Sequence, residues 1–124
     1  MTNRKYLLLL PNAGFNDVLN QLARAWTYAQ IHKRILVVDA RHSSFEDSFS
    51  RYFSTKEKDV FLRLGEALLR HFDSLPTWPP NLRGRPLEVK KFPYDGQEGY
   101  SSTIDLLQPY QEALLVHRSR SGDS

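Results

Sequence analysis

Two apolar runs flank one amphipathic segment within the first 40 residues. The first run, residues 5–10, is continuously apolar after Lys5 and is closed by Pro11. The second, residues 34–40, is rich in β-branched residues and carries an acid near its end. Short unbroken apolar runs of this kind are typical of strands buried on both faces of a parallel sheet. The segment between them repeats apolar residues at steps of four and three, which predicts a helix over about residues 17–32.

This strand–helix–strand order predicts a parallel βαβ unit over residues 1–40. Asn16 is expected to cap the helix, with Asp17 in the first turn, where the helix dipole favours an acid. A length of 124 residues suits one domain. We therefore expect a single α/β domain over residues 1–124, built as a Rossmann-like parallel sheet with flanking helices.

Residues 43–73 are predicted to be helical. Ser43 or Ser44 offers a capping box before an aromatic face within residues 45–53. Thr55 is expected to cap a second helix, whose apolar face repeats at helical spacing. The residues of that face are Phe61, Leu64, Leu68 and Phe72.

The second half of the chain is broken by prolines. Residues 74–86 hold four prolines in 13 positions, which predicts a loop. Residues 87–92 alternate weakly and suggest a strand, and residues 105–113 a short helix that Pro109 starts or interrupts. The last strand is predicted at residues 114–117, followed by a polar tail to residue 124.

Composition excludes several classes of site. The chain has no cysteine, which rules out a disulfide framework, a thiolate zinc site, an iron–sulfur cluster and a cysteine nucleophile. Its histidines share no metal-ligand spacing, so no metal is expected. The apolar run at residues 6–10 is too short for a membrane span or a signal peptide, which favours a cytoplasmic protein.

A net charge of +3 does not point to nucleic acid as a partner. The basic residues are dispersed, apart from one group in the second half of the chain. Binding of nucleic acid through that group is a weaker alternative, which a steep salt dependence would reveal; the group consists of Arg83, Arg85, Lys90 and Lys91.

The turn at residues 12–17 is the first candidate site. Gly14 lies between a buried strand and the start of a helix, where the backbone can approach a ligand closely and free N–H groups can bind an anion such as a diphosphate. The turn lacks the glycine patterns of dinucleotide-binding folds and P-loops. The alternative is that Gly14 only closes a tight connection.

A family resemblance supports the first interpretation. Residues 12–17 (Asn-Ala-Gly-Phe-Asn-Asp), with the alanine-rich helix face and the strand that follow, resemble the N-terminal motif of fucosyltransferases related to protein O-fucosyltransferases and rhizobial nodulation fucosyltransferases. Residues 44–49 (Ser-Phe-Glu-Asp-Ser-Phe) are similar to the next stretch of that family. Together these segments cover about 40 residues, with two departures: Ala13 replaces a preferred glycine, and Asp17 a preferred Asn or Gln.

The resemblance implies a GT-B architecture, in which two Rossmann-like domains face each other. It implies transfer of fucose from GDP-fucose to a glycan or protein hydroxyl without a catalytic metal or other cofactor. The backbone of Ala13, Gly14 and Phe15 would lie against the donor, and Asn16 would face the transfer site.

The tail is the second candidate site. The family carries His-x-Arg-x-Gly-Asp, and Arg120-Ser121-Gly122-Asp123 fits its second part, with His117 displaced by one residue. The resemblance implies that Arg120 neutralises charge on the departing GDP, with His117 and Asp123 beside the donor. The alternative is a polar terminus without function.

The sequence thus predicts a fucosyltransferase-like domain, truncated or standing alone. Without a second domain it is expected to be inactive, because a nucleotide sugar normally needs both walls of an interdomain cleft. A non-catalytic Rossmann-like binding module, or an inactive fragment, is the alternative. The oligomeric state is left open.

Overall fold

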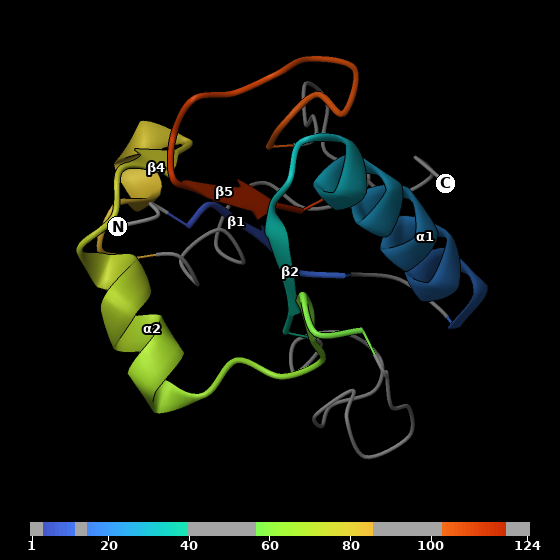
Figure 1. Ribbon diagram of the computed structural model, residues 1–124, viewed down its shortest axis with the longest axis horizontal. Coiled ribbons are helices and arrows are strands. Elements are labelled where there is room, and N and C mark those ends of the chain that lie inside the picture. Colours follow the sequence, from blue (N-terminus) through green and yellow to red (C-terminus); the bar gives the residue numbers. More distant parts are fainter. Residues whose placement is uncertain (1–3, 12–14, 40–56, 86–102, 119–124) are drawn as a thin grey trace, which may run out of the picture.

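A five-stranded, all-parallel sheet forms the centre of the molecule (Figure 1). The computed structural model describes residues 4–11, 15–39, 57–85 and 103–118. Across the sheet the strands follow the order β3-β2-β1-β5-β4. Along the chain the elements are β1 (Tyr6–Leu9), α1 (Phe15–Ile31), β2 (Ile35–Val38), β3 (Val60–Phe61), α2 (Glu66–Asp73), β4 (Thr77–Trp78), the 3₁₀ helix η2 (Pro80–Leu82) and β5 (Leu114–His117).

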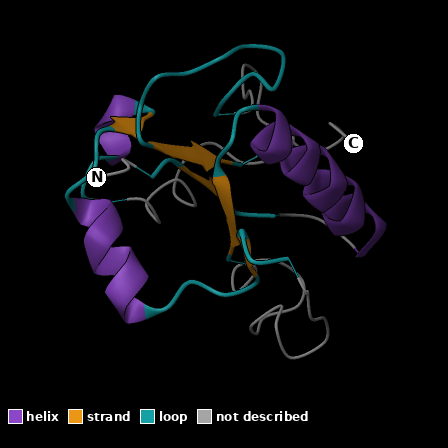
Figure 2. Ribbon diagram, in the orientation of Figure 1, coloured by secondary structure: helices purple, strands orange, loops and turns teal. Residues whose placement is uncertain are grey.

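The two helices cover opposite faces of the sheet (Figure 2). Leu7 and Leu9 of β1 pack with α1, whereas Tyr6, Leu8 and Leu10 pack with α2 and its neighbours. This alternation follows from the pleat of a strand, which sends successive side chains to opposite faces. Covered on both sides, β1 is buried throughout, as its unbroken apolar sequence predicts.

The predicted α/β class and the parallel βαβ unit are confirmed. β1 and β2 pair in parallel on either side of α1 in the sequence, and the last predicted strand is β5. The expected N-cap is wrong, because α1 begins at Phe15 and Asn16 is its second residue. The turn therefore passes into helix earlier than the position of Asn16 suggested.

Two helical predictions are also wrong. Residues 60–61 form β3 beside β2, and the helix begins only at Glu66; two residues of β-strand leave no period that a sequence reveals. No helix forms over residues 105–113, where the Asp105 carboxylate accepts from Leu107 N at 2.9 Å and Asp105 N donates to the Tyr110 hydroxyl at 2.8 Å. These local bonds form a turn in place of a helix.

The proline-rich segment is more ordered than predicted. Residues 74–86 were expected to form a loop, yet Thr77–Trp78 form β4, which pairs with β5 at the edge of the sheet, and η2 follows directly. Proline is compatible with an edge strand, because on the outer side of that strand no backbone N–H has to donate to a neighbouring strand. The predictions for residues 43–56 and 87–92, and for the tail at 119–124, lie outside the described residues.

Candidate functional site at the carboxyl edge of the sheet

The central strands end side by side. Leu9 of β1 lies opposite Val38 of β2 and His117 of β5. Beyond the last pairs, Asp39 N donates to Leu9 O at 3.0 Å and Leu10 N donates to His117 O at 2.9 Å. These bonds fix the direction in which the chain leaves each strand.

Polar side chains are buried at this edge. The exposed fractions of Asp39, His117 and Arg118 are 3%, 2% and 7%. Buried ionisable groups are costly unless other groups solvate them, so they concentrate where the fold has a use for them. We call these three residues the carboxyl-edge cluster.

The cluster lies where the strand order reverses. From β1 the chain builds outward through β2 to β3, and it then crosses to the other side of β1 to form β4 and β5. In open parallel sheets, ligands bind in the crevice outside the carboxyl ends of the strands at such a reversal. Here that position lies between the ends of β1 and β5.

Thr103 holds the chain at the end of β5. Its hydroxyl donates to Val116 O at 2.6 Å and accepts from Arg118 N at 2.8 Å, and its own N–H donates to Arg118 O at 3.2 Å. Three bonds from one residue fix the backbone on both sides of His117. Thr103 is therefore a positioning residue for the cluster.

The structure brings two of the sequence-derived sites to this edge. His117 ends β5, and α1 begins at Phe15 only a short connection after β1, so the first turn of α1, with Asn16, lies at the same edge. Ala13, Gly14, Arg120 and Asp123 lie outside the described residues.

Sequence reasoning missed Asp39 and Arg118 as site residues. A signal for Asp39 was present: it directly follows the second strand, 25 positions after Gly14. In dinucleotide-binding folds an acid about 20 residues beyond the glycine turn contacts a ribose hydroxyl. Arg118 carried no comparable signal, because its position depends on a bond from its backbone N–H to the Thr103 hydroxyl, 15 positions earlier in the sequence.

Within the described residues, no group of three or more His, Cys, Asp or Glu side chains could hold a metal ion. None of the helices described is long and apolar enough to cross a membrane. Comparison with known proteins finds no matching family model, no matching curated protein and no matching solved structure.

Proposed function

We propose that this chain is the N-terminal domain of a fucosyltransferase-like glycosyltransferase, and that its carboxyl edge contacts GDP-fucose. The observation that carries the proposal is the carboxyl-edge cluster, buried at the reversal of strand order beside the start of α1. The resemblance of residues 12–17 to the fucosyltransferase motif points to the same edge. A second Rossmann-like domain would supply the opposite wall in a GT-B arrangement.

The proposed reaction is a displacement at the anomeric carbon. The acceptor oxygen forms a bond to that carbon and gives up its proton to a base. The bond from the carbon to the β-phosphate oxygen breaks, and GDP leaves with the electron pair. Cationic groups near the leaving diphosphate stabilise the charge that develops on it.

The proposed roles of individual residues follow from the family resemblance. The backbone of residues 13–15 would approach the donor where α1 begins, and Asn16 would face the transferred sugar. Arg120, two positions beyond Arg118, would offset the charge on GDP, and His117 and Asp123 would line the donor site. Asp39 adds an acceptor suited to ribose hydroxyls.

Amide NMR spectra of the full chain, titrated with GDP-fucose and then with GDP, test this proposal. We expect saturable shifts centred on Phe15, Asn16, Asp39 and His117. Asp39→Asn should weaken binding, while the matched control Asp73→Asn on the exposed end of α2 should leave it unchanged. A dispersed spectrum that neither ligand shifts would contradict the proposal and favour a binding module without a donor site.

A further inference from the structure

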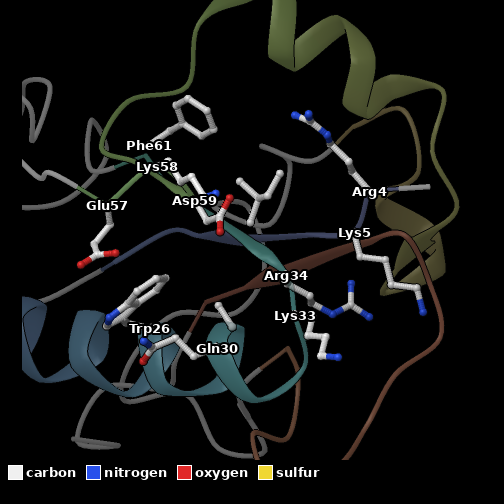
Figure 3. A pocket seen from close by; sticks show the side chains of 12 residues that line it. Arg4, Lys5, Trp26, Gln30, Lys33, Arg34, Glu57, Lys58, Asp59 and Phe61 are labelled. Carbon is white, nitrogen blue, oxygen red and sulfur yellow. The ribbon is translucent and has the colours of Figure 1, made fainter. Parts of the chain in front are cut away.

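A second candidate site lies at the opposite, amino edge of the sheet. A groove of about 770 Å³ opens there, between the end of α1, the starts of β1 and β2, and β3 (Figure 3). Small-molecule sites usually have volumes of about 300–1,000 Å³. Strands of four residues span roughly 13 Å, so β1 separates this groove from the carboxyl-edge cluster.

Basic residues from two neighbouring segments line the groove. Arg4 and Lys5 precede β1, and Lys33 and Arg34 precede β2. The two segments are neighbours because Tyr6 pairs with Ile35, and Ile35 N donates to Lys5 O at 2.8 Å. Figure 3 shows Lys5, Lys33 and Arg34 at this end of the groove, with the Arg4 side chain extending away from them and with Trp26 and Glu57 toward the other end.

Arg34 forms a fixed positive wall of the groove. It is 3% exposed, and its guanidinium donates to three backbone carbonyls: Nη1 to Tyr6 O at 3.1 Å and Glu112 O at 2.8 Å, and Nη2 to Tyr110 O at 2.8 Å. Burial lowers the pKa of this guanidinium. Among the described residues its buried Nε–H has no acceptor, which leaves one donor of a buried cation unused.

Lys33 occupies a backbone conformation that favours glycine. Its φ is 56°, in the left-handed region, directly after α1. Lys33 N donates to Gln30 O at 3.4 Å and Arg34 N donates to Ala29 O at 2.8 Å, the pattern of a Schellman cap. A lysine here costs about 1 kcal/mol relative to glycine. Strain of this kind concentrates where a side chain serves a ligand.

The positive end of the groove is not neutralised internally. Within the part of the chain that the structure describes, the exposed side chains of Arg4, Lys5 and Lys33 form no ion pair. The negative C-terminal end of the α1 dipole accounts for cations just after the helix, but not for Arg4 and Lys5 from the other segment. The remaining positive charge suits a compact anion.

We propose that this groove binds a phosphate-ester or diphosphate group, held by Lys5 and Lys33 against the wall formed by Arg34. Two exposed lysines beside a buried guanidinium match the charge of a phosphate better than that of a single carboxylate. Glu57 and Asp59 line the same groove, so a long polyanion running through it would meet repulsion. The site is independent of the proposed donor site.

Titration of the full chain with inorganic pyrophosphate, at constant ionic strength, tests the proposal by amide NMR. We expect saturable shifts at Lys5, Lys33 and Arg34, whether or not the carboxyl-edge residues also respond. A titration with GDP tests whether the groove takes only a diphosphate group or a whole nucleotide. If the groove takes the whole nucleotide, the indole N–H of Trp26 shifts together with these three amides. Shifts at the first three amides that fail to saturate would overturn the proposal.

Matched variants distinguish binding at a specific site from a general effect of positive charge. Lys33→Gln keeps a non-glycine residue in the left-handed conformation and removes its charge. It should weaken pyrophosphate binding roughly fivefold, the upper range for one solvent-exposed ion pair. Arg24→Gln removes the same charge from an exposed position of α1 and should leave binding within about twofold. Equal losses in both variants would overturn the proposal. The GDP-fucose response at His117 reports separately on the proposed function.

Discussion

Arg34 joins three segments of backbone through one side chain. Replacing it with Met keeps the length of the side chain but leaves the carbonyls of Tyr6, Tyr110 and Glu112 without their donors. We expect a loss of about 3 kcal/mol in the free energy of unfolding, because unsatisfied buried acceptors cost about 1–3 kcal/mol each and some will find water. Urea denaturation measures the loss. Arg24→Met, at an exposed position, should change stability by less than about 0.5 kcal/mol.

Tyr28, in the same region, makes the stability of the fold depend on pH in the alkaline range. Its hydroxyl donates to Gln108 O at 2.8 Å, and burial raises its pKa, outweighing the nearby Arg34 cation. A folded-state pKa above the unfolded value means that the neutral phenol is favoured by the fold. Its contribution to stability is therefore full below about pH 10 and is lost as pH rises through the folded pKa.

Tyr28→Phe isolates this contribution. The difference in unfolding free energy between the native chain and the variant should be constant at neutral pH and should shrink above about pH 10. Denaturation series at several pH values measure it, with other tyrosines and lysines cancelling in the comparison. A difference that stays constant from neutral to strongly alkaline pH would contradict the role assigned to burial.

Single residues of the site were only partly predictable. His117 was named from the resemblance of the tail to the fucosyltransferase motif, and the structure places it at the end of β5, at the carboxyl edge of the sheet. Asp39 and Arg118 were missed as site residues, because burial of a charged side chain depends on contacts distant in the sequence. The buried position of Arg34 likewise depends on carbonyls more than 70 positions away, at residues 110 and 112.

At the scale of elements, Lys33 at the end of α1 allows a test of backbone strain. Lys33→Gly relieves the left-handed φ of 56° and should stabilise the fold by about 1 kcal/mol, despite the greater freedom of glycine in the unfolded chain. Lys33→Ala retains the strain and should give no such gain. Thermal denaturation of both variants measures the difference. Equal melting temperatures would show that the position carries no strain.

The elements that were predicted correctly are those whose pattern is long or unbroken. β1 and β2 are buried runs, and α1 repeats its apolar residues over several turns. β3 and β4 have two residues each and exist because a neighbouring strand supplies hydrogen bonds. Their formation is a property of the sheet, so helical periodicity predicted a helix over β3, and the prolines predicted a loop over β4.

At the scale of the whole molecule, the last described strand sits inside the sheet. β5 pairs with β1 on one side and β4 on the other, so the sheet is incomplete until residues 114–117 are present. Removing them exposes apolar side chains on both faces of the sheet. Leu115 packs in the core on the α1 side, and Leu114 and Val116 pack in the core on the α2 side. Folding of the sheet therefore depends on residues 114–117.

Two truncations separate this structural role from the proposed donor site. A chain ending at residue 113 should be unfolded, since it loses buried apolar side chains worth about 2 kcal/mol each as well as the central pairing. A chain ending at residue 119 keeps β5 and should give a dispersed amide spectrum. Because it lacks Arg120 and Asp123, it should bind GDP-fucose more weakly than the full chain while retaining the pyrophosphate response at Lys33. Unchanged affinity for GDP-fucose would remove the tail from the proposed site and leave the start of α1 and the carboxyl-edge cluster as its contacts.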